Sequence, residues 1–271
     1  TVLGVDFWQI DTEANEAINL TQNTQPIMLT AGVATWRVYQ VLGGQLPVAM
    51  AGHSLGEYTA LVAAGAISFA DALPLVKFRA EAMQQAVPEG QGAMAAILGL
   101  DDDTVRAVCA ESAQGQVVEA VNFNSPGQVV IAGDKAAVER GMELAKAKGA
   151  KRALPLPVSV PSHCALMQPA AEQLRAYLQN VTVSTPLVPV LHNADVAAYS
   201  DAAQIKDALV RQLYSPVRWV ETVQQLAAQG VLSSAECGPG KVLAGLAKRI
   251  VAEMTCVALV NDESVQTFIA Q

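Results

Sequence analysis

Apolar and polar positions along the chain alternate between helix-like and strand-like patterns. Residues 26–42 carry apolar side chains at helical spacing, with a proline near the start, which predicts an amphipathic helix. Residues 48–51 form a short apolar run typical of a buried strand, and residues 55–66 are helical again. A strand, a tight turn and a helix in this order form the unit of a parallel α/β sheet, so the sequence predicts an α/β fold.

The middle of the chain has a different pattern. Ser68 caps a predicted helix that continues to residue 86, and the turn PEGQG follows. Beyond it, strands and helices follow one another in the order β-α-β-β-α-β within about 70 residues, which matches the ferredoxin-like motif. The predicted strands are 93–100, 117–122, 129–132 and 152–158, and the predicted helices are 101–113 and 135–148. We therefore expect a ferredoxin-like small domain at 89–158, inserted in a large α/β domain formed by 1–88 and 159–271.

The last part of the chain returns to the α/β pattern. Residues 162–180 read as a helix, and an apolar run at 189–192 reads as a strand. Helical segments lie on both sides of Pro216. A short strand at 233–236, a helix from Val242 and an apolar run at 256–260 complete the predicted elements.

Composition narrows the function classes. A hydrophobic content of 52% in 271 residues permits a large core, and a formal net charge of −8 argues against nucleic acid as the main partner. No apolar run reaches the roughly 18 residues of a membrane helix, and the N-terminal residues 1–17 lack the features of a signal peptide. Four cysteines stand without metal-ligand spacing, which indicates reduced thiols, no metal site and a cytoplasmic protein.

Ser54 is the first candidate for chemistry. It stands in the pentapeptide GHSLG at 52–56, between the predicted strand and helix, which is the pattern of a nucleophile elbow. In such a turn the serine hydroxyl is exposed at the end of the strand. The backbone N–H of Leu55, at the helix start, would face a developing oxyanion. The alternative is a capping serine in a glycine-rich turn.

A nucleophilic serine needs a base, and the chain contains three histidines. His53 adjoins Ser54, and neighbouring side chains diverge on so sharp a turn. His192 ends an apolar run, which favours a structural role. His163 lies just beyond a strand, where α/β proteins place functional loops, and is the candidate base, the alternative being a solvent-facing histidine. No aspartate stands in an obvious orienting position, so we expect a dyad in which a backbone carbonyl holds the other ring nitrogen.

Arg79 is the third candidate. It lies in an otherwise apolar helical stretch, which predicts a buried or half-buried guanidinium. The planar fork of an arginine can hold a carboxylate through two hydrogen bonds. The alternative is an ion pair with Glu57 or Glu81.

Several longer motifs carry a family resemblance. The chain resembles the malonyl-CoA:acyl carrier protein transacylases of bacterial fatty acid synthesis, from about Leu3 to the C-terminus. The resemblance implies an α/β-hydrolase-like large domain with a ferredoxin-like insert. It also implies an S-malonyltransferase that uses malonyl-CoA and acyl carrier protein and needs no cofactor. The motifs that carry it are GHSLGEY, GAMAAILGL, NFNSPGQVVIAG, LPVSVPSHCALM, VRQLYSPVRW and GPGK.

The resemblance also implies roles for single residues. Ser54 would carry the malonyl group, His163 would act as general base and acid, and Arg79 would bind the malonyl carboxylate. The Leu55 N–H would serve the oxyanion hole. The backbone carbonyl near Gln212 would orient His163, and Asn122 and Asn124 would contact the substrate.

One departure from the family concerns the N-terminus. The family begins with a strand and a Gly-Gln-Gly loop whose glutamine helps to form the oxyanion hole, and no such segment precedes Thr1 in this sequence. We therefore expect a chain that begins at Thr1 to be less stable and less active than one that carries this segment.

Two other function classes stay open at this point. A serine hydrolase or thioesterase would use the same elbow and histidine but would admit water, and Arg79 favours a transferase over it. A non-enzymatic module that binds a carrier protein is disfavoured by the joint presence of Ser54, His163 and Arg79. Docking of an acidic carrier on this acidic chain would need a local basic patch, for which the candidates are Lys148, Lys151, Arg152, Lys241, Lys248 and Arg249.

Overall fold

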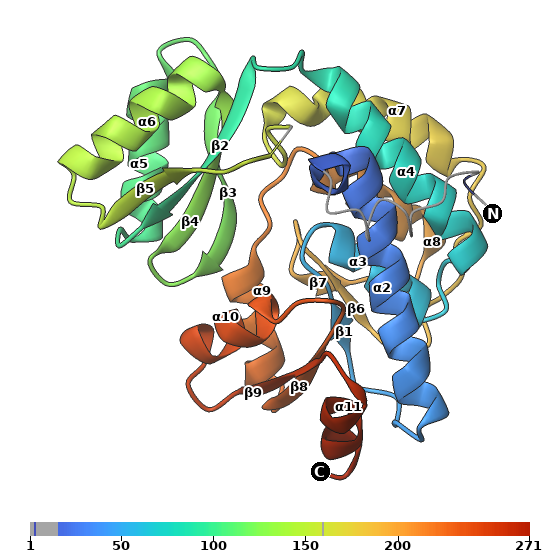
Figure 1. The fold of residues 1–271 in the computed structure, drawn as a ribbon. Coiled ribbons are helices and arrows are strands. Elements are labelled where there is room, and N and C mark those ends of the chain that lie inside the picture. The colour runs from blue at the N-terminus through green and yellow to red at the C-terminus, as the bar shows by residue number, and fades with distance from the viewer. Residues whose placement is uncertain (1–2, 4–15, 159) are drawn as a thin grey trace.

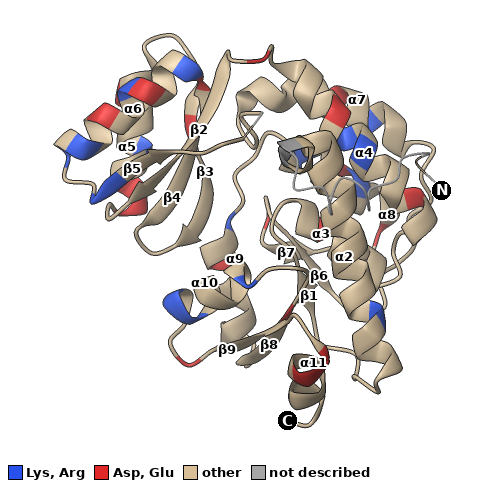
Figure 2. Cartoon of the chain, in the orientation of Figure 1, with Lys and Arg blue, Asp and Glu red and all other residues tan. Residues whose placement is uncertain are grey.

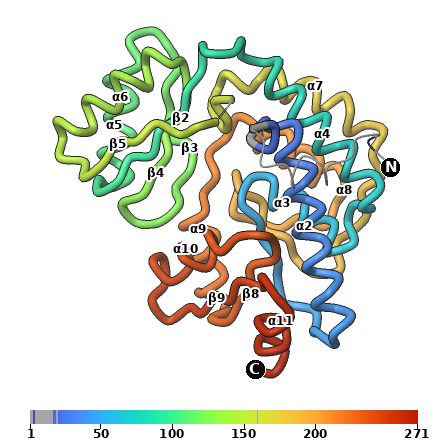
Figure 3. Tube along the Cα trace, in the orientation of Figure 1, coloured from blue at the N-terminus to red at the C-terminus, as the bar shows by residue number. Residues whose placement is uncertain are grey.

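The computed structural model describes Leu3 and residues 16–158 and 160–271. Most of the N-terminal stretch examined for a signal peptide, and with it the start of the predicted large domain, lies outside the described residues. The described part is an α/β fold, as the sequence predicts. In Figure 3 the chain leaves a group of helices at the end of α4 (Phe69–Ala86), passes through strands β2 to β5 (within residues 92–155) with two helices, and returns to the helical group at α7 (Gln168–Leu178).

The middle of the chain forms a four-stranded antiparallel sheet in the order β3-β4-β2-β5. Helices α5 and α6 cover one face of it (Figure 1). Side chains alternate between the faces, as strand geometry requires: Ile97 and Ile131 pack toward the helices, and Met94 and Val130 pack on the other face with Cys164. The elements are β2 (Gly92–Leu98), α5 (Asp102–Ala113), β3 (Val118–Ser125), β4 (Gln128–Asp134), α6 (Lys135–Ala147) and β5 (Arg152–Pro155).

The strands of this sheet begin and end at other residues than predicted. Strands β3 and β4 are longer than predicted and meet in a two-residue turn, in which Gly127 has φ 72°. A positive φ favours glycine, so the Pro-Gly pair permits the turn. Strand β5 ends at Pro155, three residues before its predicted end, because Pro155 and Pro157 each lack the N–H that a ladder needs.

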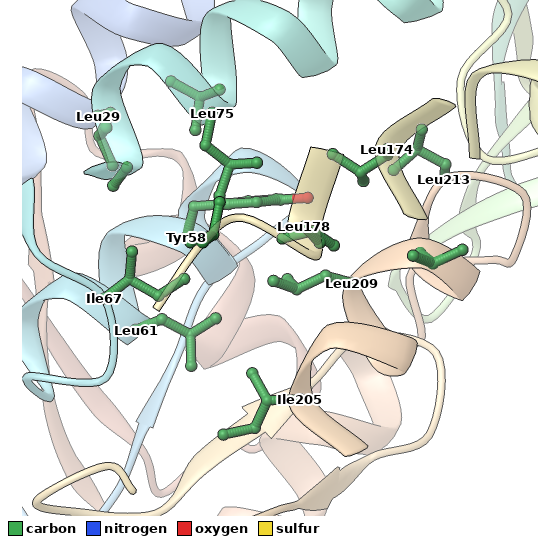
Figure 4. Close-up of a cluster of buried hydrophobic side chains, with 14 of the residues drawn as sticks. Leu29, Tyr58, Leu61, Ile67, Leu75, Leu174, Leu178, Ile205, Leu209 and Leu213 are labelled. Carbon is green, nitrogen blue, oxygen red and sulfur yellow. The ribbon is translucent and has the colours of Figure 1, made fainter. Parts of the chain in front are cut away.

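A layer of helices surrounds the largest apolar core (Figure 4). Tyr58 and Leu61 on α3 are fully buried there, against Leu29 of α2 and Leu75 of α4. Helix α4 packs against α2 on one side and α7 on the other, and α7 packs against α8. These helices are α2 (Thr21–Val41), α3 (Leu55–Ala63), α4 (Phe69–Ala86), α7 (Gln168–Leu178) and α8 (Ala202–Gln212), preceded by the 3-10 turn η1 (Glu16–Asn19).

The remaining strands form two small sheets. Strand β1 (Met50–Ala51) pairs in parallel with β6 (Val190–His192), which also pairs with β7 (Ala197–Ala198). Strand β8 (Ser233–Cys237) pairs in parallel with β9 (Thr255–Leu259). Helices α9 (Trp219–Ala228), α10 (Val242–Ile250) and α11 (Asp262–Ile269) flank them, and β7 and α11 have no counterpart among the elements predicted from the sequence.

The predicted helix at 162–180 is wrong at its start. Residues 162–164 form a turn, the 3-10 turn η2 (Ala165–Met167) follows, and α7 begins only at Gln168. His163 has φ 67°, which an α-helix cannot contain, and Pro169 occupies the first turn of α7 instead.

The four-stranded sheet is joined to the rest of the protein beside the elbow. Val217 donates its N–H to the Val121 carbonyl at 2.8 Å, and Phe123 donates to the Val217 carbonyl at 3.1 Å. Strand β3 is thereby fixed next to the segment that precedes α9. No described helix is long and apolar enough to span a bilayer.

Candidate active site

Ser54 occupies the turn between β1 and α3 with φ 52° and ψ −109°. This region of backbone conformation is unfavourable for a residue with a side chain, and such strain is typical of functional turns. A Cβ on Gly52 would lie 2.0 Å from the backbone C and O of Gly56, so the turn requires glycine at 52. A Cβ on Gly56 would meet nothing within 4 Å. The two glycines of the pentapeptide are therefore not equivalent.

His163 lies between Ser54 and the end of α8, and both of its ring nitrogens are hydrogen-bonded. Its Nε2 lies 2.8 Å from Ser54 Oγ, and its Nδ1 lies 2.8 Å from the carbonyl oxygen of Gln212. A carbonyl can only accept, so Nδ1 carries the proton and Nε2 accepts from the Ser54 hydroxyl. The backbone N–H of His163 also donates to the Leu213 carbonyl at 3.0 Å. The C-terminal carbonyls of α8, which lack partners within the helix, thus hold both the ring and the main chain of His163.

Burial, together with the nearby positive charge of Arg79, lowers the pKa of His163 to about 3, against the opposing effect of the Gln212 hydrogen bond. The imidazole is therefore neutral at neutral pH, which is the form that can accept a proton from Ser54.

Arg79 is 1% exposed and reaches the same serine. Its Nη1 donates to Gln25 Oε1 at 2.7 Å, and its Nη2 donates to Gln212 Oε1 at 2.9 Å and to Ser54 Oγ at 3.2 Å. Its Nε is buried and finds no hydrogen-bond partner in the part of the chain that the structure describes. Burial lowers the pKa of Arg79, but a guanidinium stays protonated in proteins.

The alternative of an ion pair for Arg79 is wrong. Glu81 lies 4.0 Å from Lys77, and Glu57 bonds to other residues. Within the described ranges every hydrogen-bond acceptor of Arg79 is neutral. Because no carboxylate of the described residues bonds directly to this buried cation, its fork is suited to receive a carboxylate from outside the chain.

A buried polar network, which the sequence analysis missed, supports the elbow. The carboxyl of Glu57, fully buried on α3, contacts His192 Nδ1 at 2.6 Å and accepts from the Asn193 N–H and from Gln212 Nε2. The Asn193 carboxamide bonds to Gly52 O and to the Ser54 N–H. The one sequence feature that indicates this network is Glu57, which is the only charged residue of α3.

The other two histidines do not contact the serine hydroxyl. His192 is bound to Glu57, which fits the structural role expected from the sequence. His53 Nε2 lies 2.8 Å from Asn124 Oδ1, and its ring lies 5.7 Å from that of Trp219. Burial lowers the pKa of His53. The Nε2 of His53 is therefore directed at Asn124 on β3 and not at Ser54 Oγ.

The remaining residues singled out by the sequence lie close by. Leu55 begins α3, so its N–H has no acceptor within the helix. Asn122 Oδ1 on β3 is buried and has no hydrogen-bond partner among the described residues, whereas the Asn124 carboxamide bonds to His53. Gln212 contributes more than its carbonyl, because its side chain also donates to the Ser54 carbonyl at 3.0 Å. In the described part of the chain no cluster of His, Cys, Asp and Glu could hold a metal ion.

Comparisons with known proteins show which family the chain belongs to. Residues 4–267 match the acyl transferase domain family. The chain is similar to the malonyl CoA-acyl carrier protein transacylase of Salmonella typhimurium, with 58% identity over 99% of this chain and 87% of that protein. It is also similar to a solved acyl-carrier-protein S-malonyltransferase from Burkholderia pseudomallei, with 59% identity and a TM-score of 0.97 over 100% of this chain and 88% of that one. A third relative is a malonyl-transacylase solved in complex with its type II PKS acyl-carrier protein, with 54% identity and a TM-score of 0.97 over 99% and 87% of the two chains.

We predict that the two elbow glycines respond differently to the same substitution. Gly52→Ala forces its Cβ against the Gly56 backbone and should lower the free energy of unfolding by about 1–3 kcal/mol or more. Gly56→Ala meets open space in a helix and should leave stability unchanged or raise it by up to about 1 kcal/mol. Urea denaturation of both variants measures the difference, and equal losses would contradict it.

Proposed function

The chain belongs to the acyl transferase domain family and, within it, to the malonyl CoA-acyl carrier protein transacylases, and we propose that Ser54, His163 and Arg79 perform its malonyl transfer. The reaction moves a malonyl group from malonyl-CoA to acyl carrier protein. The observation that carries the residue assignment is the 2.8 Å contact between Ser54 Oγ and His163 Nε2, with Arg79 Nη2 at 3.2 Å from the same oxygen.

The first half of the reaction acylates the serine. Ser54 Oγ attacks the thioester carbon of malonyl-CoA while His163 Nε2 takes the hydroxyl proton. The carbonyl oxygen becomes an oxyanion, which the Leu55 N–H at the start of α3 stabilises together with the helix dipole. The C–S bond then breaks, and the proton on His163 goes to the departing thiolate of CoA.

The second half repeats these steps in reverse order. The phosphopantetheine thiol of the carrier protein gives its proton to His163 and attacks the malonyl-serine carbonyl. Ser54 leaves and regains the proton. The Gln212 carbonyl holds Nδ1 protonated throughout, so that Nε2 is always the nitrogen that exchanges protons. Only protein groups, malonyl-CoA and the phosphopantetheine thiol of the carrier protein take part, so the reaction needs no cofactor.

Arg79 selects a substrate that carries a carboxylate. Its fork, now bonded to neutral acceptors, would bind the malonyl carboxylate through two charge-assisted hydrogen bonds. That pairing also offsets the positive charge that lowers the pKa of His163, so the charged substrate makes the base stronger. A hydrolase of neutral esters would gain nothing from a buried arginine, which supports the transferase over that alternative.

The two asparagines of β3 have different proposed roles. Asn122 contacts the substrate directly, which its unpartnered buried Oδ1 supports. Asn124 acts indirectly, because its carboxamide is bonded to His53.

The fold supports a division of the chain into a small and a large domain. Residues 89–158 are proposed as a ferredoxin-like small domain, which the strand order β3-β4-β2-β5 with both helices on one face supports. Residues 1–88 and 159–271 are proposed as the α/β-hydrolase-like large domain, since β1, the elbow and α3 follow one another there as in that fold. A cytoplasmic location is proposed from family membership, since malonyl-CoA and the carrier protein are its substrates.

Basic side chains suggest where the carrier protein docks. Figure 2 shows Lys and Arg on α6, on β5 and on α10. Lys148 is 3.0 Å from Glu111 and is partly neutralised, whereas Arg249 on α10 bonds only to the neutral Gln128 side chain of β4. The better candidates to meet an acidic partner are therefore the exposed basic residues for which the described part of the chain shows no ion pair, namely Lys151, Arg152, Lys241, Lys248 and Arg249.

We predict that Ser54→Ala abolishes covalent malonylation. Mass spectrometry of the intact protein, after rapid mixing with malonyl-CoA, should show the adduct in the parent chain and none in the variant. Ser162→Ala, which removes a half-buried hydroxyl next to His163, should keep the adduct. An adduct that persists in Ser54→Ala would place the nucleophile elsewhere.

We predict that His163→Asn slows malonyl transfer by about 10²–10⁴-fold. An asparagine amide can still donate to the Gln212 carbonyl, so the variant removes the base while it keeps the buried hydrogen bond. The matched variant His192→Asn keeps its bond to Glu57 in the same way and should retain most of the activity. Steady-state rates of both folded variants test this, and equal losses would show that the base is misassigned.

We predict that Arg79→Ala reverses the preference for malonyl over acetyl donors. Loss of a desolvated charge pair costs about 2–5 kcal/mol, or tens to thousands of fold in malonyl transfer, while acetyl transfer should be unchanged or faster. Arg79→Lys keeps the charge without the fork and should be intermediate. The ratio of kcat/KM for malonyl-CoA and acetyl-CoA measures the effect, and an unchanged ratio in Arg79→Ala excludes the clamp.

A further inference from the structure

Asn193 lies directly after β6 and is 1% exposed. Its side chain makes two short hydrogen bonds to the elbow. Nδ2 donates to the Gly52 carbonyl at 2.7 Å, and Oδ1 accepts the Ser54 N–H at 2.7 Å. These two partners fix the orientation of the carboxamide, since a carbonyl needs a donor and an N–H needs an acceptor.

The two bonds span the strained part of the chain. Gly52 and Ser54 stand on either side of His53, where the backbone leaves the strand before α3 begins. Ser54 has φ 52°, so its conformation persists only if surrounding contacts hold it. Asn193 supplies a donor to one side of this turn and an acceptor to the other, which only a carboxamide side chain can do at this length.

Asn193 is itself held in place. Its backbone N–H donates to Glu57 Oε2 at 2.8 Å, and its carbonyl accepts the Arg218 N–H at 3.2 Å. It contacts neither Arg79 nor His163 through any hydrogen bond of the described residues. Its contacts with the site are therefore with the backbone that carries the nucleophile.

We propose that Asn193 is a positioning residue that sets the Ser54 hydroxyl at its distance from His163 by clamping the Gly52 carbonyl and the Ser54 N–H. This proposal rests on the proposed role of Ser54 as nucleophile. The clamp also occupies the Ser54 N–H, which leaves the Leu55 N–H as the elbow amide directed at the substrate. A misplacement of about 1 Å in such a site costs on the order of a hundredfold in rate.

The test uses Asn193→Asp and Asn193→Leu, with His192→Asn as the matched control. Asp keeps an acceptor for the Ser54 N–H but cannot donate to Gly52 as a carboxylate, and Leu has a similar shape without either group. His192 is equally buried and bonds to the same Glu57 carboxyl but does not touch the elbow. Each protein is treated with a fluorophosphonate, which forms a P–O bond to the serine with loss of fluoride, and is separately assayed for malonyl transfer.

The expected result is a fall of about 10–100-fold in fluorophosphonate labelling of Ser54 for both Asn193 variants, and a change of less than about threefold for His192→Asn. In the transfer assay kcat should fall and KM for malonyl-CoA should stay constant, because Asn193 makes no proposed contact with substrate. Labelling at the parent rate in a folded Asn193→Asp would overturn the proposal, and so would an equal loss in His192→Asn. Failure of the proposed function would look different, since the parent chain would then label at Ser54 and transfer no malonyl group.

Discussion

The buried carboxyl of Glu57 is the group on which the site depends. It lies on α3, one turn beyond Ser54, and is fully removed from solvent. A polar group in that environment must be hydrogen-bonded, because the cost of leaving it unpaired is several times the gain of an ordinary hydrogen bond. Its partners are His192 and Asn193 at the end of β6 and Gln212 at the end of α8. The hydrogen bonds that the Glu57 carboxyl requires therefore bring the segments of Asn193 and Gln212 to the Ser54 turn. Gln212 in turn bonds to His163 and Arg79.

The residues that resemble a local motif could be found from the sequence. Ser54 stands in a glycine-flanked turn between apolar runs, and Arg79 is a charge within an apolar helix. Gln25 and Asn193 could not be found in this way, because each is an ordinary polar residue whose partner lies far away along the chain. The periodic pattern also placed His163 in the first turn of a helix at 162–180, whereas the left-handed backbone there follows from hydrogen bonds to two carbonyls at the end of α8.

Ser54 and His163 share an unusual feature. Both have a positive φ, which costs roughly 1–3 kcal/mol for a residue with a side chain. In each case buried hydrogen bonds from other elements hold the conformation, through Asn193 for the serine and through Gln212 and Leu213 for the histidine. The core of α2, α4, α7 and α8 supplies the rigid frame against which this strain is maintained. Precise geometry at the serine is thus obtained at the expense of local stability.

His53 links the elbow to strand β3. Its ring is bonded to Asn124, and the next residue along the chain is Ser54. The distance between β3 and the elbow is therefore set at this contact by the combined length of two side chains, while the Val217 backbone bonds fix β3 to the segment that precedes α9. An engineer who wished to enlarge the space for longer acyl groups by moving β3 would also disturb the serine. Acyl-group size and nucleophile placement cannot be tuned independently at this contact.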